Sequence, residues 1–316
     1  QFPFTPNCGN DGTSGSQFDG WYPSFMSPGA AAGHTKLTGT VFHQNGCDTG
    51  PRVFASRAFT ITTQPQTPPA LTPGSLANGA TYVAGGLVPG SWAQVKGTGL
   101  ASITRIWTNF DFLNLGSNLP ASLSNVQVTV NNTPAAVYYI SPTQIDFQVP
   151  AGIAGNASVQ VIDNGATSNT LTAAAAASSP GLFANTVNGV NYPAAVFPDG
   201  HYVGNPAVSS AYRNAVPGDV VELYATGLTT APGGVVPTAG SISGVTVTLG
   251  GVTVPASYAG QTPYAGEFQI NFTVPQQFAN RPADNYVLTI AYNSTSSPMT
   301  INSSPQGPIV IPVKPF

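Results

Sequence analysis

Alternation of apolar and polar residues with a period of two is the main pattern along this chain of 316 residues. It is clearest at 126–130, 145–149, 245–249 and 270–274, where every second residue is Val, Ile, Leu or Phe. Gly, Pro and Asn flank these runs, as turn residues flank half-buried antiparallel strands. The pattern therefore predicts an all-β fold of short strands. The side chains expected to point into hydrophobic cores are Ile145, Phe147, Val149, Ile270, Phe272 and Val274.

An internal repeat organises these strands. Val88-Pro89-Gly90 recurs as Val216-Pro217-Gly218, 128 residues later. The run QIDFQVP at 144–150 recurs as QINFTVP at 269–275, 125 residues later. Landmarks in the same order and with similar spacing indicate a duplicated unit. Because each unit has about 100 residues of short strands, immunoglobulin-like β-sandwiches are favoured.

The repeat divides the chain into four predicted parts. Residues 1–70 form an N-terminal segment that ends in a Pro-rich linker, which is extended and semi-rigid. Residues 71–178 and 179–304 form the two repeats, and residues 305–316 form a C-terminal tail. The expected fold is all-β: two tandem immunoglobulin-like β-sandwich domains, preceded by a small disulfide-stapled segment and followed by an extra strand.

Charged residues are scarce, which narrows the possible functions. They make up 6% of the chain, against about 25% in an average soluble protein. Eight Lys and Arg residues form no basic patch, so a nucleic-acid partner is not expected, because phosphates must be neutralised. No apolar run approaches the length of about 18 residues that a membrane span needs. A surface rich in Ser, Thr and Asn is typical of an extracellular or cell-surface protein, and low charge favours association between copies.

Two cysteines, Cys8 and Cys47, lie near the N-terminus. In a secreted chain an even pair predicts one disulfide. It would close a loop of about 40 residues and stabilise the segment by roughly 3–4 kcal/mol. Two reduced cysteines in a core are the alternative.

Six short motifs occur in a fixed order along the repeats. They are SLANGA at 75–80, VPGS at 88–91, GTGL at 97–100, SPTQIDFQVP at 141–150, SPGLF at 179–183 and LYATGL at 223–228. Together they resemble the Solibacter-type uncharacterised C-terminal domain, a family abundant in secreted proteins of Acidobacteria. The GTGL turn is also similar to that of IPT/TIG immunoglobulin-like modules. The resemblance spans about residues 75–302 and implies a secreted, modular surface protein with no assigned activity.

Candidate chemical groups are few, and each has a simpler explanation. The potential metal ligands within one segment are His34, His43, Cys47 and Asp48. Their spacing fits no zinc motif, so loop residues are the favoured interpretation. Glu222 and Glu267, the only glutamates, would have to lie about 5 Å apart to act as a retaining glycosidase pair. Lys96 is expected to face solvent. No catalytic residue, metal site or cofactor is predicted, and no enzyme activity is expected.

The tail at 305–316 contains one more apolar strand. Repeat one ends its last strand near Leu171, which corresponds to about Thr300 in repeat two, so the tail strand is expected to be supernumerary. Pro308 and Pro312 are four residues apart, so in an extended strand both face the same edge. The backbone N–H groups that point to the other edge all remain available for pairing. We therefore expect strand addition to a neighbouring subunit, with folding back on its own chain as the alternative. The expected interface residues are Ile309, Val310, Ile311, Val313 and Phe316.

Three functions remain open on the sequence alone. The favoured one is a secreted, non-enzymatic structural or adhesive protein whose copies associate into a filament through the tail. The alternative is a carbohydrate-binding module that also uses surface glycans as partners. Its candidate stacking residues are Trp21, Tyr22, Trp92, Trp107 and many of the other tyrosines, although aromatic residues more often pack in cores or interfaces. The third is an enzyme within residues 1–70.

Overall fold

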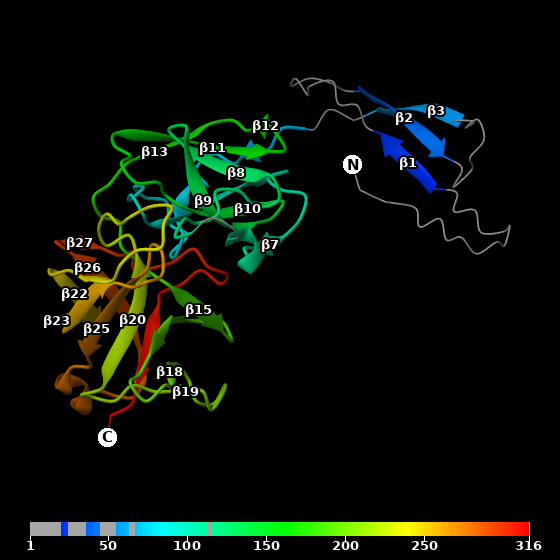
Figure 1. Cartoon of the computed structure of the whole chain (residues 1–316). Helices are drawn as coiled ribbons and strands as arrows, with labels where there is room; N and C mark the ends of the chain where they lie inside the picture. The colour runs from blue at the N-terminus through cyan, green and yellow to red at the C-terminus, as the bar shows by residue number, and fades with distance from the viewer. Residues whose placement is uncertain (1–19, 25–35, 45–54, 63–66, 113–115, 316) are drawn as a thin grey trace, which may run out of the picture. The chain divides into compact units, whose positions relative to one another are not determined.

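The computed structural model describes residues 20–24, 36–44, 55–62, 67–112 and 116–315 (Figure 1). The chain divides into two compact units, Gln1–Thr67 and Pro68–Phe316. The first unit contains one described antiparallel sheet, formed by β1 (Gly20–Ser24), β2 (Lys36–Gln44) and β3 (Ala55–Thr62). Cys8 and Cys47 lie outside the described residues, so their disulfide stays a prediction.

The described regular structure of the second unit is almost entirely β. Its short helices are the 3-10 turns η1 (Asn109–Phe112) and η2 (Gln276–Asn280). No helix within the described ranges has the length and apolar character needed to cross a membrane.

The first half of the second unit forms one ten-stranded sheet around one hydrophobic core. The strand order is β12-β11-β8-β9-β10-β6-β4, with β13 on β11, β5 on β6 and β7 on β9. The core takes its side chains mainly from β6, β8, β9, β10 and β11. These strands are β4 (Ala70–Leu71), β5 (Ala77–Asn78), β6 (Trp92–Thr98), β7 (Arg105–Ile106), β8 (Val126–Val130), β9 (Thr133–Ile140), β10 (Gln144–Gln148), β11 (Asn156–Asp163), β12 (Ala166–Thr167) and β13 (Leu171–Ala174).

The second half packs side chains of two larger sheets into a second core. One sheet has the order β19-β18-β17-β20-β25-β24-β21 with β14 on β20, and the other has the order β23-β22-β26-β27 with β28 on β26, while β15 and β16 pair separately. Leu223 and Phe272 from the first sheet meet Val247 and Ile290 from the other in this core. The strands are β14 (Gly181–Leu182), β15 (Ala184–Val187), β16 (Val190–Pro193), β17 (Ala195–Val196), β18 (Tyr202–Val203), β19 (Tyr212–Arg213), β20 (Val220–Thr226), β21 (Gly240–Ser241), β22 (Val245–Leu249), β23 (Val252–Pro255), β24 (Tyr258–Gln261), β25 (Phe268–Thr273), β26 (Asp284–Tyr292), β27 (Thr295–Ser296) and β28 (Val310–Val313).

The strand register expected from the alternation is confirmed. β8 and β22 cover the two Val-rich runs, and β10 and β25 cover the two QIxF runs. A register shifted by one residue would have turned all of the expected inward side chains to solvent. Instead, all six are fully buried: Ile145, Phe147, Val149, Ile270, Phe272 and Val274.

The tail supplies the last strand of the second half, and the expectation of a supernumerary strand is wrong. β28, the red segment in Figure 1, pairs antiparallel with β26 as β13 pairs with β11. Leu87 bridges to Ala175 in parallel, and Ala215 bridges to Val313 in the same way. Since both the partner strand and the parallel bridge correspond, β28 is the counterpart of β13.

The apolar face of the tail lies inside the second core. Ile309, Ile311 and Val313 are at most 4% exposed and pack with the other core side chains. Val310 is also buried, while Phe316 lies outside the described residues. The tail therefore folds back on its own chain, which was the alternative to strand addition.

An insertion hid this correspondence in the sequence. Ser168 and Ser297 are equivalent, because each exchanges hydrogen bonds with the residue opposite it on the neighbouring strand, Val161 and Ile290 respectively. β13 begins three residues after Ser168, whereas the equivalent position in the second half, Ile309, comes twelve residues after Ser297. The extra residues form an excursion at 298–308, which we call the strap.

The strap connects the two halves. The Asn302 backbone N–H donates to the carbonyl of Thr81 at 2.8 Å, and its side-chain amide donates to the carbonyl of Tyr82 at 3.1 Å. Tyr82 has a φ of 58°, a conformation that a bulky residue adopts only where its surroundings require it. The strap, which belongs to the second half, thus fixes the conformation of a turn in the first half.

A buried joint also connects the halves. Gln148 is fully buried, donates to the Gly90 carbonyl at 2.9 Å and accepts from the Gly234 N–H at 2.8 Å. A Cβ added to Gly90 would lie 2.2 Å from the carbonyl oxygen of Ala231. A glycine at position 90 is therefore required for the two backbones to approach this closely.

Candidate functional site

A cleft between the two halves is the candidate functional site. Its cavity volume is about 720 Å³, which is within the range of small-molecule sites, roughly 300–1,000 Å³. Eight aromatic side chains and two carboxylates line it, with no basic residue among the described lining. The lining residues are Gly79, Tyr82, Trp92, Trp107, Phe112, Leu119, Tyr138, Asp146, Phe183, Ala194, Tyr224, Val236, Pro263, Tyr264, Ala265 and Glu267.

Trp92, the first residue of β6, is fixed by hydrogen bonds from the opposite half. Its indole Nε1–H donates to the Ala265 carbonyl at 2.7 Å. Its backbone N–H donates to Thr226 Oγ1 at 3.0 Å, and that hydroxyl donates to the Gly266 carbonyl at 2.7 Å. With its polar edge satisfied, the ring has one orientation at the junction of the two halves.

Trp107 and Tyr138 complete a cluster of rings around Trp92. The ring centroids are 4.9 Å apart for Trp107 and Tyr138, 5.8 Å for Trp92 and Trp107, and 5.7 Å for Trp92 and Tyr138. All three pairs are edge-to-face, the arrangement that aromatic quadrupoles favour. Phe112 adds a fourth ring, 5.1 Å from Trp107.

A β-bulge brings Tyr138 into this cluster. In the pairing of β9 with β10, Phe147 faces Val137 and Asp146 faces Tyr139, so Tyr138 is the extra residue. A bulge re-aims the side chains next to it. Because Tyr138 and Tyr139 both remain partly exposed between the buried Val137 and Ile140, the strand places two adjacent tyrosines outside the core.

The opposite wall is the hairpin between β24 and β25. Thr262 Oγ1 donates to Glu267 Oε1 at 3.0 Å and accepts from the Tyr264 backbone N–H at 3.1 Å. These contacts fix the four residues between them, so that Tyr264 is 72% exposed at the cleft. An exposed aromatic ring held on a short hairpin is available to a ligand.

Asp146 is the more strongly perturbed carboxylate of the cleft. Burial raises its pKa to about 6, against the lowering effects of hydrogen bonds from Gln144 and Gln94 and of the Lys96 charge. The Gln144 amide lies 2.9 Å from Oδ1. Burial and then the charge of Asp146 raise the pKa of Tyr82.

Glu267 is the second carboxylate of the cleft. Burial raises its pKa, and the hydrogen bond from Thr262 only partly opposes this. Burial, followed by the charges of Glu222 and Glu267 and by Tyr264, raises the pKa of Tyr224. Of the two glutamates that the sequence singled out as a possible pair, only Glu267 is among the described lining residues, although the charges of both act on Tyr224.

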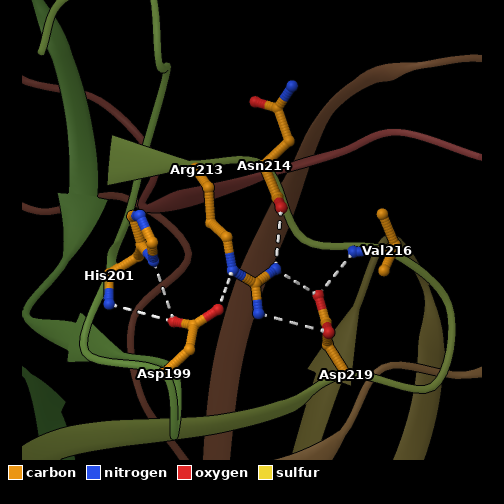
Figure 2. Close-up of polar contacts among 6 residues, drawn as sticks. All are labelled: Asp199, His201, Arg213, Asn214, Val216 and Asp219. Carbon is orange, nitrogen blue, oxygen red and sulfur yellow. Dashed lines mark hydrogen bonds and ion pairs between the residues drawn. The ribbon is translucent and has the colours of Figure 1, made fainter. Parts of the chain in front are cut away.

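A separate charged cluster lies on the excursion that carries β18 and β19 (Figure 2). Arg213 donates to Asp199 at 2.9 Å and to Asp219 at 2.7 Å, and Asp199 also accepts from the His201 backbone N–H at 3.0 Å. The guanidinium lies 3.5 Å from the centre of the buried Phe197 ring. These interactions attach the excursion to the second core, and the cluster is not part of the cleft lining.

The structure brings together two of the aromatic residues that the sequence suggested for stacking on a sugar. Trp92 and Trp107 meet in the cleft, while Trp21 and Tyr22 are outside the residues whose side chains are described. The same holds for the metal candidates His34, His43, Cys47 and Asp48. Lys96 is exposed, as expected.

The sequence does not single out Tyr138, Tyr224 and Tyr264 among the many tyrosines, and it gives no sign that Asp146 belongs to a site. Alternation marks Asp146 as an outward residue, but it does not show what the outward face meets. The bulge at Tyr138 and the approach of the second half depend on contacts between residues far apart in the sequence, which no local pattern encodes.

Comparison with known proteins identifies one domain. Residues 102–179 match the IPT/TIG domain family, which confirms an immunoglobulin-like domain in the first half. The likeness to the Solibacter-type family and the assignment of the second half as a tandem domain stay predictions. In sequence, no curated protein matches the chain.

Several solved structures show weak similarity. The surface glycan-binding protein SGBP-B of the Bacteroides ovatus mixed-linkage glucan utilization locus, in complex with a mixed-linkage heptasaccharide, is 11% identical, with a TM-score of 0.28 over 93% of this chain and 61% of its own. Domains 5–6 of the S-layer protein SbsC are 12% identical, with a TM-score of 0.24 over 78% of this chain and 99% of theirs. An SGBP-B from a xyloglucan locus of Bacteroides uniformis is 12% identical, with a TM-score of 0.23 over 90% and 81%.

Proposed function

We propose that the second unit binds a saccharide chain in the aromatic cleft, as the non-catalytic binding region of an extracellular or cell-surface protein. The observation that carries this proposal is the convergence of Trp92, Trp107 and Tyr138 with Tyr224 and Tyr264 from the other half. Large, partly exposed aromatic surfaces that persist in a folded protein mark interaction sites.

The composition of the cleft suits a sugar ring. The C–H faces of a pyranose carry partial positive charge and pack against the negative faces of aromatic rings. Its hydroxyl groups need hydrogen-bond partners at the edges of the stack. Asp146 and Glu267 accept hydrogen bonds there, and the Tyr224 and Tyr264 hydroxyls can donate or accept them.

Two other ligand classes fit less well. Nucleic-acid bases also stack on aromatic rings, but their phosphates require cations, and the described lining has carboxylates instead. A purely apolar ligand would bury both carboxylates further and add no hydrogen-bond donor to them, which is costly.

Self-association through the tail has lost its main support. The filament hypothesis depended on a free strand, and β28 is paired with β26 of its own chain. The proposal therefore keeps the extracellular, non-enzymatic binding role and makes glycans the partner.

The test is binding of soluble saccharides by intact protein, with Trp107→Ala as the main variant. A glycan array followed by titration of the best neutral or charged oligosaccharide should give saturable binding, which Trp107→Ala weakens by about ten-fold or more. Tyr258→Ala is the matched control, because Tyr258 is 40% exposed and does not line the cleft. Absence of binding on the array, or equal losses in both variants, would contradict the proposal.

A further inference from the structure

We infer that the cleft selects saccharides that carry a protonated amine, such as glucosamine polymers, over neutral and acidic ones. This inference rests on the proposed function and adds the class of sugar. It depends on the charges and on the ring faces of the cleft.

Among its described lining residues, the cleft has two carboxylates and no cationic side chain. Asp146 and Glu267 both line it. Within the described part of the chain, the ion pairs within 4 Å belong to two groups. Arg105 pairs with Asp111. Arg213 pairs with Asp199 and Asp219, and His201 also lies beside Asp199. Neither cleft carboxylate belongs to these pairs, so each lacks a charged partner.

The groups around Asp146 leave its charge available. Gln144 and Gln94 donate hydrogen bonds to it, and Lys96, beyond ion-pair distance, acts on it only through its charge. Lys96 is itself exposed to solvent, and Tyr82 is the titratable neighbour on the other side. A cation that entered the cleft would meet an acceptor with no ammonium or guanidinium bound to it.

The groups around Glu267 are similar in kind. Thr262 donates one hydrogen bond to it, and the titratable neighbours that share the Tyr224 site are Glu222 and Tyr264. None of these groups carries a positive charge that could neutralise the carboxylate. An acidic saccharide would add a third negative charge here, which disfavours uronic acids and sulfated sugars.

The aromatic walls of the cleft also favour a cationic ligand. The faces of Trp and Tyr rings attract cations, and the attraction increases when water is excluded. Trp92, Trp107 and Tyr138 line the same cavity as both carboxylates. An amine on a sugar ring that stacks here would contact negative ring faces as well as a carboxylate.

Binding of such a ligand is coupled to proton release. Burial keeps part of the Asp146 carboxyl protonated near pH 6, and a bound ammonium group favours the ionised form. The complex therefore gains affinity as the pH rises toward 6 from below. Above that pH the gain stops once the amines of the ligand lose their protons.

Three tetrasaccharides with the same β-1,4 backbone test the inference. Glucosamine tetramer has an amine at each C2, its N-acetylated form has an amide, and cellotetraose has a hydroxyl. Isothermal titration of intact protein near pH 6 should show the glucosamine tetramer binding at least about ten-fold more tightly than the other two. Added salt should weaken that binding and leave any binding of the neutral sugars nearly unchanged.

The variants Asp146→Asn and Glu267→Gln separate charge from shape. Each should lower the affinity for glucosamine tetramer by about ten-fold. The affinity for cellotetraose should fall much less, because the amide oxygen of Asn or Gln still accepts a hydrogen bond from a hydroxyl group. Asp284→Asn is the matched control, because this carboxylate is exposed and lies outside the lining. Equal affinity for all three sugars would overturn the amine preference and leave the proposed function standing. Binding of none of them, together with a negative glycan array, would overturn both.

Discussion

The two halves of the second unit share their inward residues and differ in their outward ones. On the strand pair β6 and β10, the inward residues are Val95 and Phe147. They correspond to Leu223 and Phe272 on β20 and β25, and all four side chains are fully buried. The outward side chain of Asp146 has Asn271 as its counterpart. A repeated core thus maintains the same scaffold twice, while the two outward surfaces differ: the first copy carries the ring cluster and Asp146, and the second contributes Tyr264 and Glu267 to the cleft.

The halves also differ in how their last strand is reached. A short connection leads to β13, and the strap leads to β28. Four predictions test this comparison, beginning with the largest expected effect.

Deletion of residues 305–316 should unfold the second half. It removes Ile309, Ile311 and Val313 from the core, and losing each large aliphatic side chain costs roughly 2–5 kcal/mol. Urea unfolding followed by tryptophan fluorescence and circular dichroism should show the loss of a cooperative transition. A truncated protein that stays fully folded and monomeric, alongside a full-length protein that forms oligomers, would instead revive strand addition between subunits.

Phe147→Ala and Phe272→Ala should destabilise the protein by similar amounts, roughly 3–5 kcal/mol each. Both side chains are fully buried at equivalent positions. Chemical denaturation of the two variants measures the difference. If the loss were large in one half and below about 1 kcal/mol in the other, the two cores would not be equivalent.

Asp146→Asn should stabilise the protein at pH 7, because it gives the first half the residue that the second half already has. The pKa of Asp146 is raised from 3.8 to about 6 in the folded state. The protonated form therefore favours folding, and this contribution is fully present below about pH 4 and is lost as the pH rises through 6. The gain at pH 7 is at most about 3 kcal/mol.

Denaturation curves at several pH values between 4 and 7 distinguish the ionisation of Asp146 from an effect of the substitution that does not depend on pH. Wild type should lose stability across that window, and Asp146→Asn should lose less. Glu222→Gln, on the equivalent outward face of β20, is the control. A variant that is less stable than wild type at pH 7 would show that the ionised carboxylate is favourable where it lies.

Asn302→Ala should have the smallest effect. It removes the side-chain hydrogen bond to the Tyr82 carbonyl and an exposed one from Gln306, and it keeps the backbone bond to Thr81. The expected loss is about 1 kcal/mol. Ligand affinity should fall as well, because Tyr82 lines the cleft. Hydrogen exchange at residues 79–83 would show whether the turn opens more often, and unchanged exchange would mean that the strap does not hold it.

Much of the fold could be predicted from alternation and from the repeat. The strands around Phe147 and Phe272 were found in the correct register because a period of two is a local property of the sequence. The place of Ile311 was not found, because the strap shifts the last strand away from the position that repeat spacing implies. Spacing is reliable only where connections have equal lengths.

The candidate site was predictable only in part. Trp92 and Trp107 were recognisable as large aromatic residues outside the alternating core positions. Tyr138 reaches the outer surface through a bulge, and Tyr264 reaches the cleft through the packing of one half on the other. Such features depend on tertiary contacts, so the outward residues could be identified but not their partners.

The place of β28 in the sequence has a consequence for the order in which the molecule is built. On a chain emerging from the ribosome, all strands of the first core are present once Ala175 has appeared, and this half can close early. The second core must wait for Val313. Until then the edge of β26 that β28 covers is open, which exposes a nascent chain to wrong pairing. The cleft, whose walls come from both halves, is therefore the last region to assemble.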